Sequence, residues 1–431
     1  MSYDDAISFH SLYQGLKLSQ RNVIWKDSVA GYSLNGLKNT YKLRKSLLNN
    51  SYRLSAYHRF LIKEPKERDI LATHISDRQF QRSLCDNELT PTISKSFIRD
   101  NVACLKGHGV DDGVNRLKEF FHKFYINHGL DGYILKCDIK GYFPNTRFDI
   151  AQNKIIKHVP DLKSASRACE IIESFCESSI MDELCELGLN EYTAHNLAHY
   201  ISNVRCAILV IKICNMNNQK EINKYKTKIR KRILQDLPTA TDEFIQHVTN
   251  DVYRGIGLGS QASQLTELLM LNDLDHFIKE KLHIKYYIRY MDDFILIHQD
   301  KEYLQYCLKE ITSKLKEVDL YLNNKTKIFQ LKQGVTFLKW RYIITDTGKV
   351  LLRMKKKKIT KQRKKLRKLK NLYDECRISI EDVRNNFRSW QANAEKGDTY
   401  HVISRMRNYY KELFKEDAPY GTKYFKQPKQ S

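Results

Sequence analysis

The hydrophobic and polar positions along the chain follow two periods, and each change of period marks a predicted element. Within 113–128, apolar residues recur every three to four positions, which predicts a helix with one buried face. The members of that face are Val114, Leu117, Phe120, Phe121 and Phe124. Short apolar runs that end in turn residues predict strands instead, at 132–143 and on both sides of the turn within 286–298.

Two more segments show the pattern of antiparallel hairpins. Residues 57–80 predict a strand, a charged turn with the sequence EPKER and a second strand. Residues 334–353 predict a single hairpin with its turn near Asp346–Gly348. Hairpins pair strands that are close in sequence, so both segments indicate antiparallel sheet.

The remaining long segments have helical patterns. Residues 148–250 lack strand-like runs, and 302–318 and the part after residue 353 show helical spacing. A Gly-rich turn at 254–263 is expected to lead into a helix that continues to about Leu282. Antiparallel strands separated from helical segments predict an α+β fold.

The charge of the chain changes this picture by suggesting a partner. Lys and Arg number 74 against 50 Asp and Glu, a formal net charge of +24 over 431 residues. Such an excess favours a polyanion, and nucleic acid is a better candidate than a membrane surface. The longest apolar run, 206–214, is too short to span a bilayer, and the first ten residues do not resemble a signal peptide. Ten cysteines without a CxxC pair indicate reduced thiols and a cytoplasmic location.

Two adjacent carboxylates interrupt the most strand-like segment, YYIRYMDDFILIH at 286–298. A two-residue hairpin turn normally contains Asn-Gly or Asp-Gly, whereas this one carries Asp292 and Asp293. Neighbouring carboxylates repel unless positive charge lies beside them, and a pair of divalent cations supplies it. A third carboxylate, Asp138, ends the apolar strand YILKC. Together these residues predict a two-metal site, while a solvated turn is the alternative for either element alone.

Six motifs of this sequence resemble those of reverse transcriptases, and their order along the chain is also that of the family. Tyr290-Met291-Asp292-Asp293 is similar to their YxDD sequence, and CDIKGYF at 137–143 to their first catalytic strand. FLIKEPKERDI resembles the fingers hairpin, RGIGLGSQAS the Gly-rich turn before the palm helix, and LNNKTKI and GVTFLKW the elements after the catalytic turn. KGHGVDDGVNRL and LGSQASQ resemble stretches of bacterial enzymes from diversity-generating retroelements and their defence-associated relatives. The resemblance implies a right-hand polymerase with fingers, palm and helical thumb.

The resemblance also implies roles for individual residues. Asp138, Ile139, Asp292 and Asp293 are expected to bind two Mg²⁺ ions, with Mn²⁺ as a substitute, and the three aspartates to be catalytic. Lys66 and Arg68 are expected to hold the nucleotide phosphates, and Lys325 to lie close to the pyrophosphate. Gly259 should allow close approach to the nucleotide, and Ser263 and Gln264 should begin the palm helix beside it. For Lys66, Arg68 and Lys325 a solvated surface charge is the alternative interpretation.

Phe143 bears on the choice of nucleotide. It follows Asp138 by five residues, where reverse transcriptases carry an aromatic ring that excludes a ribose 2′-hydroxyl. We therefore expect dNTP use, with a core phenylalanine as the alternative. The sequence departs from the family at Gly257-Leu258, where Pro-Gln is common, and this removes a polar contact near the sugar.

The motifs divide the chain into five predicted parts. These are an N-terminal region with fingers at 1–131, the first palm strand at 132–147, a helical insertion at 148–250, the palm at 251–348, and a basic helical thumb and C-terminal region at 349–431. The insertion contains the basic cluster KEINKYKTKIRKR at 220–232, which either grips structured RNA or packs against a protein partner or a second copy of the chain. The dense lysines after residue 353 favour contact with the primer-template duplex.

These observations predict an RNA-directed DNA polymerase that copies a dedicated noncoding RNA template into a DNA product. Antiphage defence is the expected role, and a diversity-generating retroelement is the alternative. A different class, an RNA-binding scaffold without catalysis, is disfavoured by the three intact aspartates. His195 and His199 lie four residues apart, as zinc-binding pairs do, but Asn196 stands where a zinc protease needs Glu, so no metal role is expected there.

Overall fold

The computed structural model describes residues 2–63, 67–214 and 218–426, and these residues form two compact units. Unit 1 comprises Met1–Lys106, Asp138–His283 and Lys309–Asn324. Unit 2 comprises Gly107–Cys137, Ile284–Leu308 and Lys325–Ser431. Each unit is therefore assembled from three separate stretches of chain, and helix α17 (Lys301–Lys316) begins in unit 2 and ends in unit 1.

Unit 1 is mostly helical and contains one hairpin. Its N-terminal elements are α1 (Tyr3–Ala6), α2 (Phe9–Ser19), α3 (Asp27–Leu34), α4 (Gly36–Leu48), β1 (His58–Ile62), β2 (Arg68–Ala72), α5 (Ile75–Leu84), η1 (Cys85–Leu89), α6 (Thr90–Ile93) and η2 (Ser94–Ser96). The later ones are α8 (Tyr142–Asn145), α9 (Phe148–His158), α10 (Leu162–Glu173), α11 (Cys176–Glu186), α12 (Glu191–Ile213), α13 (Gln219–Asp236), α14 (Asp242–Asn250), α15 (Gln261–Met270), α16 (Asn272–His276) and η3 (Phe277–Lys281).

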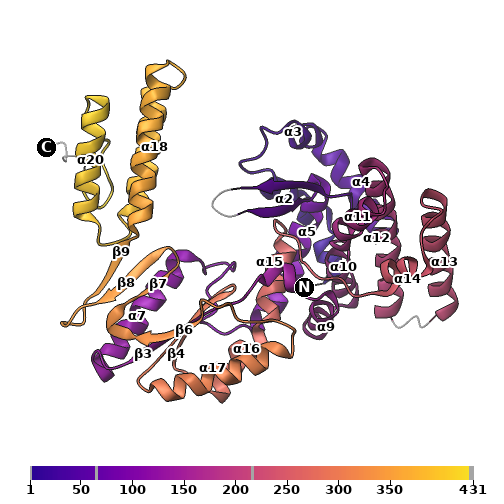
Figure 1. Cartoon of the computed structure of the whole chain (residues 1–431). Helices are drawn as coiled ribbons and strands as arrows, with labels where there is room; N and C mark the ends of the chain where they lie inside the picture. Colours follow the sequence, from indigo (N-terminus) through magenta and orange to yellow (C-terminus); the bar gives the residue numbers. More distant parts are fainter. Residues whose placement is uncertain (1, 64–66, 215–217, 427–431) are drawn as a thin grey trace. The chain divides into compact units, whose positions relative to one another are not determined.

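Many helices of unit 1 pack against α12 or α15. α12 contacts α10, α11, α13 and α14, and α15 contacts α5, α9 and α10. Figure 1 shows α13 and α14 beside α12, with α13 on the outer side of this group. The buried faces of these helices are apolar at helical spacing, as at Ile201, Ile208 and Ile211 of α12.

Unit 2 contains two antiparallel sheets and a helical C-terminal part. Its elements are α7 (Val110–His128), β3 (Tyr133–Asp138), β4 (Tyr286–Tyr290), β5 (Asp293–His298), β6 (Lys327–Gln330), η4 (Leu331–Gln333), β7 (Val335–Phe337), β8 (Trp340–Ile344), β9 (Val350–Met354), α18 (Lys356–Asp374), α19 (Ile380–Ala394) and α20 (Tyr400–Phe414). The strand orders are β4–β5–β3–β6 and β7–β8–β9.

Helix α7 supplies the aromatic core of unit 2. Phe120 and Phe124 pack edge-on against Tyr286 of β4, with ring centroids 5.7 Å apart in both pairs. Phe121 stacks on Tyr342 of β8 at 6.1 Å, so one helix contacts both sheets. The predicted helix and its buried face are confirmed, because all five members of that face are buried.

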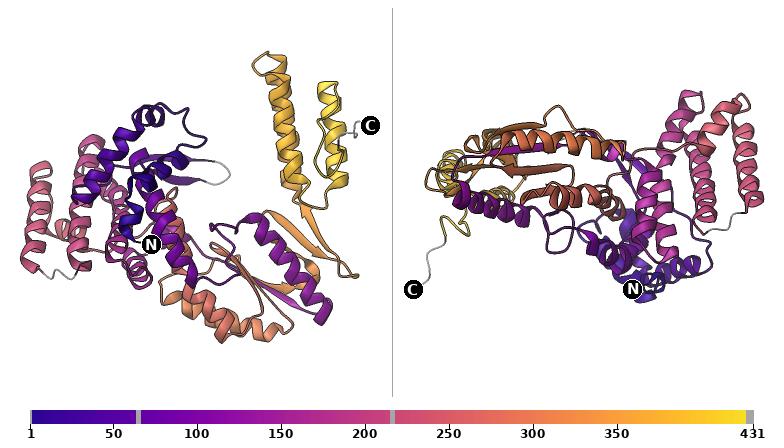
Figure 2. Two further views of the ribbon diagram at one scale, coloured as in Figure 1. Left: turned by 180° about the vertical axis from the view of Figure 1, so that it is seen from behind. Right: turned by 90° about the horizontal axis from the view of Figure 1, so that it is seen from below.

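The C-terminal helices form a small core of their own. Its buried residues are Leu366, Val383, Phe387, Met406, Tyr410 and Ala418. α18 and α20 run side by side in Figure 1 and in the left view of Figure 2, and they contact each other. The basic residues of α18 lie on its remaining surface, since only Gln362 and Leu366 of that helix are buried.

The predicted α+β class is confirmed by these antiparallel sheets and separate helices. One predicted element is wrong in detail, because 334–353 forms a three-stranded meander rather than a single hairpin. An extra tight turn at Leu338 and Lys339 takes φ values of 45° and 74°, which the sequence does not signal with Gly or Asn. Within the residues that the structure describes, none of the helices has the length and apolar character needed to cross a membrane.

Candidate active site

The paired carboxylates lie on a tight turn between two buried strands. Tyr290 pairs with Asp293, which leaves Met291 and Asp292 as a two-residue loop. Met291 has a φ of 56°, a conformation that such hairpin loops require at their first position and usually give to Gly. The guanidinium of Arg289, fully buried in β4, donates to the Met291 carbonyl at 3.1 Å. A buried arginine thus supports the loop from the sheet side.

The last residues of β3 and the first residues of β5 lie at the same end of the sheet. β3 is the neighbour of β5, and the Lys136 ammonium contacts the Asp293 carboxylate oxygens at 2.8 and 2.9 Å. Lys136 also donates to the Thr336 carbonyl at 2.8 Å. Asp138, the last residue of β3, follows Lys136 by two positions. Residues two apart in a strand share a face, so Lys136 and Asp138 project from the same face of β3.

The backbone around Asp138 is fixed by a second segment of unit 1. The Asn323 amide donates to the Asp138 carbonyl at 2.7 Å, and the Lys140 amide donates to the Tyr321 carbonyl at 2.9 Å. Ile139, which is 2% exposed, lies between these bonds opposite Leu322. Because successive carbonyls of extended chain point in opposite directions, the Ile139 carbonyl faces away from residues 321–323. This backbone carbonyl oxygen is the atom with which Ile139 could bind a metal ion.

Phe143 lies against the Gly-rich turn. The Ile256 amide donates to the Phe143 carbonyl at 3.0 Å, and the Gly255 amide donates to the Thr146 carbonyl at 3.1 Å. Phe143 itself is half-buried, with its ring edge-on to Tyr142 at 5.9 Å. The hydroxyl of Tyr142 donates to the Glu267 carbonyl in α15. Short α8 is therefore held both to the turn and to the helix that follows it.

The same turn packs on the second strand of the predicted fingers hairpin. Gly259 has a φ of 114°, and a Cβ built there would lie 3.7 Å from the Leu71 carbonyl oxygen of β2. A side chain at this position would be strained by the backbone conformation alone. Arg68 is the exposed first residue of β2 and pairs with Ile62 across the hairpin. Lys66 lies outside the described residues.

The start of the palm helix differs from the prediction. α15 begins at Gln261, and its N-cap is Ser260, whose hydroxyl oxygen accepts from the Ser263 amide at 3.4 Å. Ser263 and Gln264 therefore lie inside the first turn rather than starting it. Ser263 is completely buried, whereas Gln264 is exposed. The prediction failed because Ser260 is an equally good capping residue and lies three residues earlier.

The chemistry of the carboxylates fits Mg²⁺, which prefers hard oxygen ligands. Among the described residues, no three His, Cys, Asp or Glu side chains are grouped so as to hold a metal by themselves. Lys325, the other predicted polar participant, is exposed on the turn before β6.

A comparison with protein families identifies this part of the chain. Residues 215–360 match the family described as reverse transcriptase (RNA-dependent DNA polymerase). The match covers 146 of the 431 residues, so the likeness applies to this part of the chain. The match includes the Gly-rich turn, the 290–293 loop and strands β4 to β9, and these elements are similar to reverse transcriptases, as the sequence predicted. The first catalytic strand and the fingers hairpin lie before it.

Solved structures of two yeast telomerases are similar to the chain at low identity. One is telomerase from Candida albicans in complex with a TWJ fragment of telomeric RNA, with 13% identity, a TM-score of 0.41, and coverage of 86% of this chain and 56% of that one. The other is apo telomerase from Candida tropicalis, with 12% identity, a TM-score of 0.38, and coverage of 84% and 60%. This chain thus spans under two thirds of either telomerase chain. No curated protein sequence matches it.

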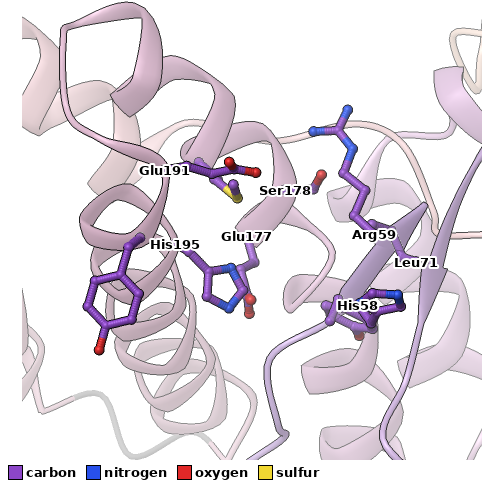
Figure 3. A pocket seen from close by; sticks show the side chains of 10 residues that line it. His58, Arg59, Leu71, Glu177, Ser178, Glu191 and His195 are labelled. Atoms are coloured by element: carbon purple, nitrogen blue, oxygen red, sulfur yellow. The ribbon is translucent and has the colours of Figure 1, made fainter. Parts of the chain in front are cut away.

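A pocket of about 440 Å³ lies outside the predicted site, among residues of unit 1 that precede residue 215. Figure 3 shows His195 and Glu191 of α12 and Glu177 of α11 facing His58 and Arg59 of β1. The Arg59 guanidinium contacts Asp69 at 2.7 Å and Asp182 at 2.6 Å, which ties the hairpin to α11. His199 contacts Glu177 at 2.9 Å, and this hydrogen bond raises the pKa of His199. His199 therefore has a structural explanation, while His195 lines the pocket.

The sequence analysis missed two charged residues beside the 290–293 loop. Lys136 lies inside the run YILKC, and Arg289 lies inside YYIRY. A single charge in an otherwise apolar strand is the signal that could have identified them, since buried charges need partners. Their partners, Asp293 and the Met291 carbonyl, become visible only when the strands are paired.

Proposed function

We propose that this protein is an RNA-directed DNA polymerase that joins dNTPs by two-metal-ion nucleotidyl transfer. The observation that supports the proposal is the tight turn with Asp292 and Asp293 within the residues that match the reverse transcriptase family, followed by strand β5, whose neighbour β3 ends in Asp138. Reactions of this type depend chiefly on positioning and charge neutralisation, which rigid strand ends provide.

In this proposal Asp138 and Asp292 hold two Mg²⁺ ions, with the Ile139 carbonyl as a further ligand. Bound Mg²⁺ would lower the pKa of the primer 3′-hydroxyl and neutralise the triphosphate charge. Asp293 would support the site while Lys136 limits the repulsion between the adjacent carboxylates, because its ammonium contacts both Asp293 oxygens. Mn²⁺ would substitute for Mg²⁺, since both accept carboxylate and water oxygens.

The proposed nucleotide contacts come from several elements of the chain. Arg68 and Lys66 would bind the nucleotide phosphates. Phe143, which contacts the Gly-rich turn, would exclude a nucleotide with a 2′-hydroxyl. Gly259 and Gln264 would line the approach to the base and sugar. Lys325 would act near the pyrophosphate. For Ser263, which is buried, the proposed contact would require a change in the first turn of α15.

The basic residues of α18 would grip the primer-template duplex. Eleven lysines and arginines lie between Lys355 and Lys370, and the core formed with α19 and α20 keeps the helix rigid. An RNA–DNA hybrid is recognised mainly through its backbone, which a row of cations suits. The template would be a dedicated noncoding RNA and the setting bacterial antiphage defence, with a diversity-generating retroelement as the second candidate favoured by the stretch LGSQASQ.

Primer extension tests the proposal directly. Wild-type protein should extend a DNA primer on an RNA template with dNTPs and Mg²⁺, and chelation should stop it. Loss of an outer-shell partner commonly costs about 10- to 100-fold, so Asp292→Asn should cost more. Asp300→Asn, on an exposed residue after β5, is the matched control. An inactive wild type that still binds RNA would instead support the scaffold interpretation.

A second assay tests the nucleotide preference. Phe143→Ala should admit NTPs while leaving dNTP use largely intact, because the substitution removes the ring and keeps the backbone bond to Ile256. Use of NTPs by the wild type would contradict the assignment to DNA synthesis. Sequencing nucleic acid that copurifies with the protein, and plating phage on cells that carry wild type or Asp292→Asn, would separate the two biological roles.

A further inference from the structure

The outer face of helix α13 carries a row of lysines that the reverse transcriptase mechanism does not use. The helix has seven lysines and arginines against two acids, Glu221 and Asp236. Lys220, Lys224, Lys228 and Lys231 are all exposed. At 3.6 residues per turn these four positions fall within an arc of about 80° and span about 16 Å along the helix. They form a row along one face.

The opposite face of α13 fixes the helix to its neighbours. Ile222, Ile229 and Ile233 are buried, and the helix contacts α12 and α14. Arg230 and Arg232, which flank the buried side, are paired with Asp242 at 2.7 Å and Asp236 at 2.9 Å. The apolar residues and these two arginines are therefore already engaged within unit 1.

The four lysines of the row have no carboxylate partner among the described residues. The Lys228 ammonium instead lies 4.9 Å from the centre of the Tyr225 ring. Like charges four residues apart repel by about 0.2–0.5 kcal/mol per pair, so the row costs stability unless an external anion compensates it. A membrane surface does not fit, because the apolar residues of α13 face inward and leave nothing to insert into lipid.

We propose that this face of α13 binds the backbone of a double-helical stem in RNA. Lysines act as point charges toward phosphate and read no bases, so the contact would recognise a stem by its shape and charge rather than by its sequence. A rigid row fits the regular backbone of a stem better than the variable path of a single strand. The inference extends the proposed function, since the stem would belong to the RNA that the enzyme copies.

The test compares three proteins, namely wild type, a variant with all four lysines changed to Gln, and a variant with all four changed to Arg. Binding of a fluorescent RNA hairpin with a long stem is measured at several KCl concentrations. Each lost phosphate contact lowers the slope of log affinity against log salt by about 0.7–0.9, so the Gln variant should lose about 3 from the slope. Its affinity at low salt should fall at least tenfold, while the Arg variant should match wild type.

Two further measurements keep the inference separate from the proposed function. Extension of a DNA primer on a short unstructured RNA template should be equal in all three proteins, and a loss of extension in wild type would concern the polymerase assignment alone. The single variant Lys224→Gln should lower the slope by less than one, which guards against a folding defect in the fourfold variant. An unchanged slope and affinity in the Gln variant would overturn the inference. It would also be overturned if the Gln variant still bound RNA normally but no longer copurified with an acidic protein that wild type retains.

Discussion

The strongest stability prediction concerns Glu395, which anchors the C-terminal segment to the thumb-like helices. Glu395 follows α19 and is 3% exposed. One carboxylate oxygen accepts from the Thr422 amide at 2.8 Å, the Thr422 hydroxyl at 2.6 Å and the Lys423 amide at 2.9 Å. The other accepts from the Gln391 side chain at 2.9 Å. A single carboxylate thus accepts hydrogen bonds both from α19, through Gln391, and from residues 422–423 of the C-terminal segment.

The energy of this anchor follows from the pKa of Glu395. Burial opposes its ionisation, but donation from Thr422, Lys423 and Gln391 outweighs burial and lowers the pKa from 4.5 to about 2. That difference corresponds to about 3 kcal/mol in favour of the charged, folded form. Because the folded pKa is depressed, this stabilisation is fully present above about pH 4.5 and is lost as the pH falls toward 2.

Hydrogen exchange of the Thr422 and Lys423 amides measures the anchor locally, without assuming that a protein of two units unfolds in one step. Glu395→Gln keeps the shape but removes the charge and turns part of the acceptor into a donor. At neutral pH the variant should exchange these amides about a hundredfold faster, as about 3 kcal/mol implies. Glu412→Gln, on an exposed residue of α20, is the matched control. Equal protection in Glu395→Gln, the control and wild type would refute the reasoning.

Three other substitutions probe the packing and charge of the two units. Gly257→Ala places a Cβ 2.6 Å from the buried Phe175 ring, so it should destabilise unit 1 by about 1–3 kcal/mol in thermal unfolding, whereas Gly31→Ala, with open space around it, should not. Arg205→Met removes the buried partner of Glu173 at 2.6 Å and two bonds to the Val248 and Asp251 carbonyls, and should cost about 3–5 kcal/mol in denaturant titration. The exposed pair of Arg230 and Asp242 is its control, since Arg230→Met should cost less than about 1 kcal/mol. Lys136→Met removes the cation at Asp293 and should tighten Mn²⁺ binding by up to about tenfold, while Lys136→Arg should leave the binding unchanged. Electron paramagnetic resonance without substrate measures the bound Mn²⁺. Weaker binding in the Met variant would show that Lys136 orders the carboxylate instead of competing with the metal.

Local patterns were sufficient for much of the fold. The helix around Phe120, the fingers-like hairpin and the strands on both sides of Asp292 follow from spacing and turn residues within about twenty positions of each other. The extra turn at Leu338 and Lys339 was missed because neither residue type favours positive φ. There the surrounding strand pairing determines the backbone, and no local propensity signals it.

The sequence by itself determined the elements, the excess of positive charge and the carboxylates that indicate a polymerase, because these depend on residue type and short-range periodicity. Only the tertiary structure decided that Lys136 contacts Asp293, that Arg289 supports the loop at Met291, and that Ser260 rather than Ser263 caps α15. The division into two units, each built from three stretches of chain, is equally invisible in local pattern. Its physical cause is that a buried charge or strand can be satisfied by any complementary group nearby in space, however distant along the chain.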